Sequence, residues 1–237
     1  MPASGAVTRN TLRQQIADAL RDEVLAGRLA PGEEFTVKQI AEQYGVSATP
    51  VREALVDLCA QGLLDSDQHR GFRVHQFSVA DYRGMVEARM LVVDGIFRRA
   101  PTAPPAEPDL SYGVTLVSIR RRGEAAARAA RAGELEVLIG YDIRYWRELG
   151  RLISANDHIA GFLHRLRVQA WVFSVPRLRA DRDCTRWLWS GHVELVDAIT
   201  RGDAECAIEV VREYNAGSLE WADFLERTER TERTERR

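Results

Sequence analysis

Asp142 and His192 could together form an acid–base pair, and proton transfer is the first chemistry that the residue types of this chain suggest. Nothing else in the sequence supports catalysis. It contains no Gly-x-Ser-x-Gly nucleophile elbow, no phosphate-binding loop and no nucleotide-binding glycine run. We therefore expect that the chain is not an enzyme.

A second set of chemically useful side chains lies in the segment 44–55, YGVSATPVREAL, where serine, threonine and arginine follow a glycine. Hydroxyl and guanidinium groups at the start of a helix suit contact with the base edges and phosphates of DNA. The elements that position these groups decide between this interpretation and an ordinary helical turn.

A helix-turn-helix is predicted around this segment. Thr36 and Gln39 stand at capping-box spacing and predict a short helix that ends near Tyr44. Gly45 can close this helix in the left-handed conformation, and Ser47 can cap a second helix. Apolar residues recur at helical spacing in the second helix and should face a core: Val51, Leu55 and Leu58. The alternative is a helical hairpin in an all-α protein, because such turns are common.

The flanking sequence favours the DNA-binding alternative. Helical spacing of apolar residues predicts a first helix over residues 12–24. Residues 62–64 and 71–74 predict two short strands joined by a polar turn. Three helices followed by such a β-hairpin form a winged helix.

Five short motifs occur in order within residues 12–76, namely LAGRLAPG (25–32), IAEQYGVS (40–47), PVREAL (50–55), GLL (62–64) and RGF (70–72). With them the segment resembles the N-terminal domain of GntR-type transcriptional regulators. The resemblance implies that seven residues approach DNA: Lys38, Ser47, Ala48, Thr49, Arg52, Arg70 and Gly71. Arg70 and Gly71 would do so from the wing. Position 48 is often arginine in the family, so an alanine here means that the operator sequence cannot be copied from relatives.

The charge of this segment is low for a DNA-binding domain. Residues 1–76 contain eight lysines and arginines against ten aspartates and glutamates, a balance of −2. Four basic residues could still cluster on the face toward DNA: Lys38, Arg52, Arg70 and Arg73. We therefore expect modest nonspecific affinity and a shallow dependence of DNA binding on salt.

Length and composition indicate a second domain. The chain has 237 residues, of which 45% are hydrophobic, and the winged helix would use about a third of them. No apolar run is long enough to span a membrane and no signal peptide is evident, so we expect a cytoplasmic protein. The three cysteines are widely spaced and are expected to be buried thiols.

From residue 78 onward the pattern is helical and predicts an antiparallel bundle, so the fold class is mainly α. After a first long helix and a proline-rich break at 101–108, helices are expected over residues 113–132, 134–154, 157–175, 182–201 and 203–225. The predicted division is a winged helix-turn-helix domain (1–76), a helical effector-binding and dimerisation domain (77–227) and a charged, disordered tail (228–237).

The second half carries Glu87-Ala-Arg89, then Asp142 followed by Leu149 and Asn156, and HVELVDAI (192–199) with Gly202-Asp203. With these residues it resembles the effector domain, called FCD, of FadR-type GntR regulators. Many members bind a divalent metal through one aspartate and three histidines. Asp142 and His192 match two of these ligands, but Trp146 and Tyr214 occupy the other two positions. Two ligands do not complete a stable zinc site, so we expect an incomplete site with no metal and no cofactor.

The aromatic replacements favour a pocket for an apolar or aromatic small molecule. The resemblance implies that Arg89 anchors an effector carboxylate, and the expected effector site comprises Arg89, Asp142, Trp146, His192 and Tyr214. Two alternatives stay open. Arg89 could instead bond to Glu87, Asp94 or Asp142 in a structural network, and the aromatic rings could simply fill the core.

The sequence therefore predicts a sequence-specific transcriptional regulator, a repressor by the commoner arrangement, whose affinity for DNA is set by a small-molecule effector. A homodimer would place two recognition helices on a palindromic double-stranded operator. The alternatives are a metal-responsive regulator of the same family and a ligand-binding helical protein without DNA-binding activity.

Overall fold

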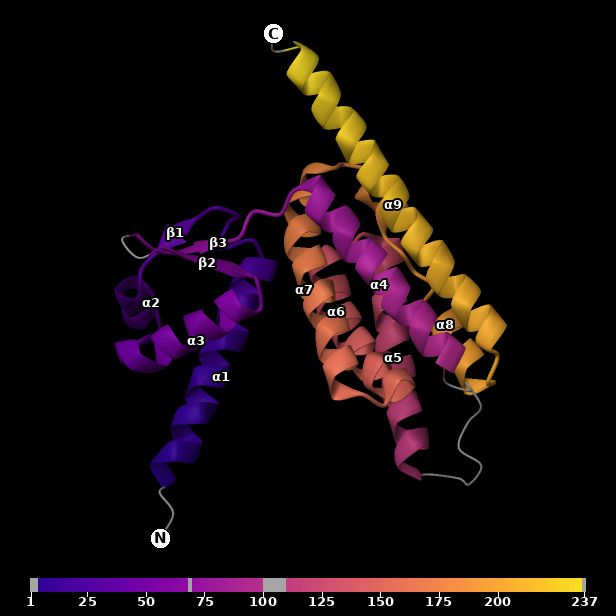
Figure 1. Ribbon diagram of the computed structural model, residues 1–237, viewed down its shortest axis with the longest axis horizontal. Coiled ribbons are helices and arrows are strands. Elements are labelled where there is room, and N and C mark those ends of the chain that lie inside the picture. The colour runs from indigo at the N-terminus through magenta and orange to yellow at the C-terminus, as the bar shows by residue number, and fades with distance from the viewer. Residues whose placement is uncertain (1–3, 68–69, 100–109, 236–237) are drawn as a thin grey trace. The chain divides into compact units, whose positions relative to one another are not determined.

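The computed structural model describes residues 4–67, 70–99 and 110–235. The chain divides into two compact units, of which the first contains the residues up to Phe77 and the second is built from most of those that follow (Figure 1). The architecture is mainly α, with a small sheet in the first unit, as predicted from the sequence.

The first unit is a winged helix. Its elements are α1 (Ser4–Leu25), β1 (Glu34–Phe35), α2 (Val37–Tyr44), α3 (Ala48–Ala60), β2 (Leu64–Asp67) and β3 (Gly71–Val74). The strands form an antiparallel sheet in the order β1-β3-β2, so the predicted hairpin gains a third strand. Gly71 has φ +99°, and a Cβ there would lie 2.6 Å from the carbonyl oxygen of Phe35. Only glycine therefore allows β3 to begin so close to β1.

The turn between α2 and α3 forms as predicted on its α2 side. The Thr36 side chain accepts from the amide of Gln39 and the Gln39 side chain accepts from the amide of Thr36, which completes the capping box. Gly45 lies in the left-handed region with φ 64° and donates to the last carbonyls of α2. On the other side, Val51, Leu55 and Leu58 are buried as expected.

The expected side-chain cap by Ser47 is wrong. Ser47 occupies the N-cap position of α3 with extended backbone, but its side chain forms no capping hydrogen bond. The third helical residue is Pro50, which has no amide hydrogen, and this amide is one of the two that an N-cap hydroxyl normally binds. The Ser47 hydroxyl is therefore exposed at the start of α3.

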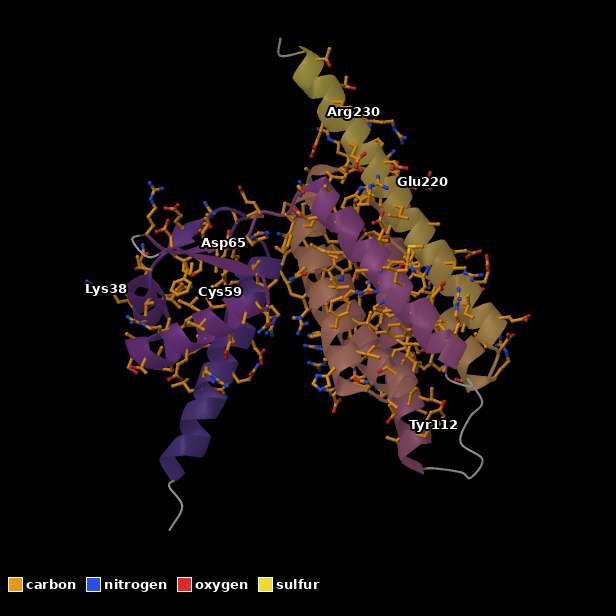
Figure 2. All side chains as sticks on the ribbon, in the orientation of Figure 1. Lys38, Cys59, Asp65, Tyr112, Glu220 and Arg230 are labelled. Carbon is orange, nitrogen blue, oxygen red and sulfur yellow. The ribbon has the colours of Figure 1, made fainter. Side chains whose placement is uncertain are left out.

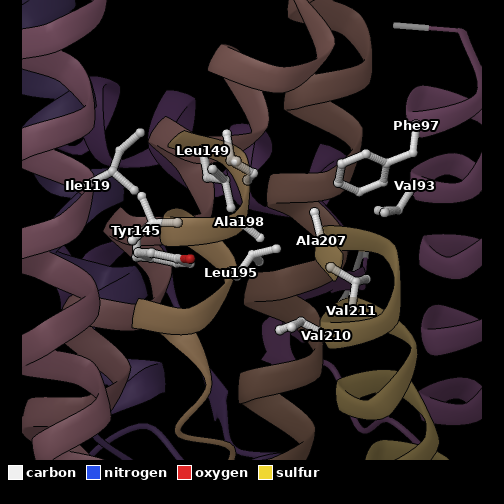
Figure 3. Packing of buried hydrophobic residues seen from close by; sticks show 12 residues of the cluster. Val93, Phe97, Ile119, Tyr145, Leu149, Leu195, Ala198, Ala207, Val210 and Val211 are labelled. Atoms are coloured by element: carbon white, nitrogen blue, oxygen red, sulfur yellow. The ribbon is translucent and has the colours of Figure 1, made fainter. Parts of the chain in front are cut away.

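The second unit is helical. It contains α4 (Val79–Arg99), α5 (Leu110–Ala132), α6 (Leu135–Ser154), most of α7 (Asp157–Ala180), the short 3-10 helix η1 (Cys184–Trp187), α8 (His192–Thr200) and α9 (Ala204–Glu235). Apolar side chains of α4, α5, α6, α8 and α9 meet in one core, which includes Phe97, Ile119, Leu149, Leu195 and Val211 (Figure 3). No helix among the described residues is long and apolar enough to cross a membrane.

In the first unit, the strand expected over 62–64 lies instead at Leu64–Asp67. Two predicted elements of the second unit also differ from the structure. The helix expected over 182–201 is interrupted, because only 192–200 is α-helical. Residues 188–191 are not helical, and the ring of Trp189 packs so closely there that a Cβ on Gly191 would lie 2.9 Å from it. The tail expected to be disordered from residue 228 continues α9 to Glu235, where threonine hydroxyls of the Glu-Arg-Thr repeat donate to carbonyls four residues earlier. The proline-rich break at 101–108 lies outside the described residues.

Candidate functional site

The surface between α2 and α3 brings three of the expected DNA-contacting residues together. Lys38, Ala48 and Arg52 line one shallow hollow whose floor includes Ala41 and Val46. The side chain of Lys38 is 83% exposed and projects outward from α2 (Figure 2). The remaining expected contacts on this unit are Ser47 and Thr49, exposed at the start of α3, and Arg70 and Gly71, which lie on the wing and not in the hollow.

Most basic side chains of this surface are already paired with carboxylates. The distances are 3.8 Å from Lys38 Nζ to Glu42 Oε1, 3.7 Å from Arg70 Nη1 to Glu34 Oε1, and 3.2 Å from Arg73 Nη2 to Asp65 Oδ2. Arg52 differs, because it is exposed and forms no ion pair with the part of the chain that the structure describes. Among the four cations expected to face DNA, Arg52 is therefore the one that no described carboxylate holds and that is free to meet a phosphate or a guanine.

The five residues expected to form the effector site converge inside the second unit. They come from four helices: Arg89 from α4, Asp142 and Trp146 from α6, His192 from α8 and Tyr214 from α9. Arg89, Asp142 and His192 are 6%, 3% and 1% exposed. Polar side chains buried to this degree require hydrogen-bonding partners, and each of the three has at least one within the cluster.

Asp142 is the carboxylate of this cluster. Its Oδ1 accepts from Trp146 Nε1 at 3.0 Å and lies 3.0 Å from His192 Nε2, while its Oδ2 lies 3.7 Å from Arg167 Nη1. The Tyr145 hydroxyl donates to the His192 carbonyl at 2.8 Å and helps to fix α8 against α6. The carboxylate is thus surrounded by donors.

Arg89 binds neutral partners. Its Nε donates to Asn215 Oδ1 at 2.9 Å, its Nη1 to Tyr214 Oη at 3.1 Å and its Nη2 to Ser218 Oγ at 3.5 Å. Burial is the main cause that lowers the pKa of this guanidinium, and the positive charge of Arg167 acts in the same direction. The expected alternative, a network of Arg89 with Glu87, Asp94 or Asp142, is not among these contacts.

Arg167 on α7 is a member of the cluster that sequence reasoning missed. It is 4% exposed, donates to Tyr214 Oη and lies with its guanidinium carbon 4.4 Å from the centre of the Trp146 ring. The one signal in the sequence was that position 167 lies on the same helical stripe as the apolar Ala160 and Leu178, both of which are buried in the structure. An arginine on such a stripe requires a buried partner.

Aromatic rings cover the two guanidiniums. The Tyr214 ring is stacked on Trp146 with centres 5.7 Å apart and lies 4.7 Å from Trp189. Trp189 in turn lies 4.4 Å from His192. Tyr214 is therefore held by two indole rings and, through its hydroxyl, by two arginines.

The donors of this cluster do not fit the divalent metal that many FCD domains bind. Asp142 and His192 are present, but Trp146 Nε1 donates to Asp142 and has no lone pair for a metal. The Tyr214 oxygen accepts from two guanidiniums, and Arg167 adds a positive charge beside the carboxylate. No group of three or more His, Cys, Asp or Glu side chains in the described residues could hold an ion.

A small cavity lies beside the cluster, between α4 and α9. Its volume is about 60 Å³, and Asn215, which accepts from Arg89, lines it together with Val93, Phe97 and Val211. A cavity of about 150 Å³ is the size that accommodates benzene. An aromatic ligand therefore enters only if a side chain of the cluster moves.

Comparison with known families assigns both units. The family described as "Bacterial regulatory proteins, gntR family" matches residues 12–74, and the FCD domain matches residues 113–216. The matched families are those of transcriptional regulators and not of enzymes.

Similar proteins agree with this assignment. The chain is 28% identical over 216 residues to the "Probable D-xylose utilization operon transcriptional repressor" of Paenarthrobacter nicotinovorans, covering 91% of both chains. It is 33% identical over 89 residues to the transcriptional repressor RspR of Escherichia coli, covering 38% of this chain and 39% of the relative. In fold it is similar to the solved structure of E. coli McbR/YncC, with a TM-score of 0.63 and 21% identity over 91% of this chain and 98% of the other.

Proposed function

Because the chain belongs to the GntR family of bacterial regulatory proteins and carries an FCD domain, we propose that it represses transcription from a palindromic operator under control of a carboxylate effector. Regulators of this family bind DNA operators. Repression, the operator's symmetry and the effector's class are proposals for this chain.

The observation that supports the DNA contact is the exposed start of α3. Ser47 and Thr49 present hydroxyl groups there, and Arg52 presents a guanidinium without an ion pair among the described residues. The N-terminus of a helix attracts phosphate through its free amides and its dipole. Arg52 then reaches a base edge or a backbone phosphate.

A gel-shift experiment tests this contact with DNA from upstream of the protein's own gene and its neighbours. Arg52→Ala should weaken specific binding by about 1–3 kcal/mol for each half-site. Arg230→Ala is the matched control, because it also removes one positive charge from an exposed arginine, here on α9 with a side chain that is 75% exposed. Equal binding by the two variants, or no retardation of any nearby promoter, would contradict the proposed role.

A homodimer is proposed because two recognition helices about 34 Å apart read two half-sites. Exposed apolar side chains of the second unit support it. Leu91 on α4 and Val114 and Val117 on α5 are 76%, 67% and 59% exposed. Sedimentation analysis should give twice the 26.7 kDa mass of one chain.

The observation that supports an anionic effector is the charge balance of the buried cluster. Arg89 and Arg167 bring two guanidiniums to the cluster. Among the side chains of the described residues that contact them there is one carboxylate, Asp142, which lies beside Arg167. A buried cation without a carboxylate partner is costly, so an anion that enters gains a two-pronged, charge-assisted contact.

A thermal-shift screen tests the effector class with benzoate, butyrate, inorganic phosphate and D-xylose. A carboxylate should raise the unfolding temperature of the protein, and Arg89→Ala should abolish this shift. Arg98→Ala on the same helix is the control, because this arginine is 78% exposed and lies outside the cluster. A shift by D-xylose alone, or one that persists in Arg89→Ala, would contradict an anion held by Arg89.

A further inference from the structure

The oxygen of Tyr214 occupies an unusual place in the cluster. It accepts a hydrogen bond from Arg89 Nη1 at 3.1 Å and another from Arg167. A phenol oxygen has two lone pairs, so these two donors use its whole acceptor capacity. Two guanidiniums that converge on one oxygen form the arrangement that binds an oxyanion.

A neutral phenol oxygen binds two guanidiniums more weakly than an anionic oxygen does. In the bonds from the two arginines to Tyr214 only the donor is charged, whereas in a guanidinium–carboxylate pair both partners are charged and the carboxylate offers a second oxygen. A hydrogen-bond donor is left over nearby, because Arg167 Nε is buried without a hydrogen-bond partner among the residues that the structure describes. An anion at this point therefore forms bonds that Tyr214 does not.

Building on the anionic effector proposed above, we propose that the Tyr214 hydroxyl is an internal stand-in for a ligand oxygen and that a carboxylate displaces it from Arg89 and Arg167. Arg167 supplies the second positive charge of the site, so the site needs no metal. The class of ligand is a monocarboxylate with an apolar body, which takes the place that the Tyr214 ring leaves.

Displacement of Tyr214 has an optical consequence. The ring is stacked on Trp146 and lies against Trp189. When the ring leaves, both indoles exchange an aromatic neighbour for the ligand, and the intrinsic fluorescence of the protein changes. This signal reports on Tyr214 itself, whereas a thermal shift reports on binding anywhere in the molecule.

The first experiment compares the full-length protein with Tyr214→Phe. The probes are benzoate and butyrate, titrated by tryptophan fluorescence in the presence of a chelator. Phenylalanine keeps the ring but removes the competing oxygen, so benzoate should bind about tenfold more tightly to the variant, the effect of one hydrogen bond to a charged group. Weaker or equal binding by Tyr214→Phe overturns the proposal, because the hydroxyl would then be a ligand contact or a bystander.

The second experiment tests Arg167 with Arg167→Gln and Arg167→Lys. Glutamine removes the charge and should abolish benzoate binding, while lysine keeps the charge without the two-pronged geometry and should retain part of it. Circular dichroism confirms folding, and if glutamine unfolds the protein, the lysine variant alone decides. Affinity equal to that of the unchanged protein in either folded variant overturns the role of Arg167.

These outcomes separate the inference from the function on which it rests. If Arg89→Ala abolishes the thermal shift but Tyr214→Phe weakens binding, the anionic effector stands and the stand-in role falls. If no carboxylate binds either the unchanged protein or Tyr214→Phe, the effector class and the stand-in role both fall, while the gel-shift result for Arg52 still decides the DNA contact.

Discussion

Asp142 and Arg167 show how one side chain changes what its neighbour can hold. A buried carboxylate with a histidine beside it has the chemistry of half a metal site. In this chain the guanidinium of Arg167 lies 3.7 Å from the carboxylate, and Trp146 donates to its other oxygen. The positive charge that a metal would bring is therefore already supplied by the protein.

We predict that the protein folds and stays stable without a bound metal. We expect metal analysis of the purified protein to find well under one zinc or nickel ion per chain, and a chelator to leave the unfolding temperature unchanged. A contrasting double variant, Trp146→His with Tyr214→His, restores nitrogen donors at both altered positions. Its unfolding temperature should rise with added zinc. One tightly held ion per unmodified chain would contradict the prediction.

The residues of the cluster were predictable to different degrees. A motif resemblance placed Arg89, Asp142 and His192 at matching positions. Arg167 was not found, because an arginine on a helical stripe is usually an exposed side chain. Its burial depends on Tyr214, which lies 47 positions later in the sequence. Such partners are set by packing between helices, which helical spacing alone does not reveal.

The residues that terminate α2 and α6 differ in type although both have left-handed backbone. Gly45 closes α2 with φ 64°, whereas α6 is closed by Ala155 with φ 45°. Both residues lie in the left-handed region, which favours glycine because a Cβ there crowds the backbone. Ala155 is thus a strained position that Asn156 follows at once, as the cap of α7.

Replacing Ala155 by glycine and Gly45 by alanine should change the free energy of unfolding in opposite directions. Ala155→Gly should raise the free energy of unfolding by about 0.5–1 kcal/mol, because it relieves the left-handed strain. Gly45→Ala should lower it by about 1 kcal/mol, since nothing lies within 4 Å of the added Cβ and only the backbone cost remains. Urea unfolding measures both changes, and an Ala155→Gly variant less stable than the original chain would show that the strain is absent.

Helices and strands could be predicted where a few neighbouring residues determine where the element begins and ends. The capping box of α2 and the glycine that follows it fixed both ends of that helix from a few residues. The helix expected over 182–201 failed because residues 188–191 are not helical. Trp189 packs against Gly191 in this segment, and such a contact has no periodic signal in the sequence. Strand β1 was missed for a similar reason, since two residues gain strand geometry only by pairing with β3.

The net charge of the whole chain is close to zero. The chain carries 33 lysines and arginines against 35 aspartates and glutamates, so it has no long-range attraction for DNA. On the winged helix, three of the four expected DNA-facing cations are paired with carboxylates. A phosphate must displace each of these carboxylates before it gains the cation, so few counterions are released when DNA binds.

The dependence of operator binding on salt should therefore be shallow. We expect the logarithm of the binding constant to fall with the logarithm of salt with a slope of about −2 to −5, against about −10 for a strongly basic repressor. Glu34→Gln should free Arg70 on the wing, tighten nonspecific binding and steepen the slope by about one for each chain in contact. Glu220→Gln on α9 changes the net charge equally but lies in the other unit, so it should do neither. A slope near −10 for the unmodified protein, or equal slopes for the two variants, would mean that these ion pairs do not compete with DNA.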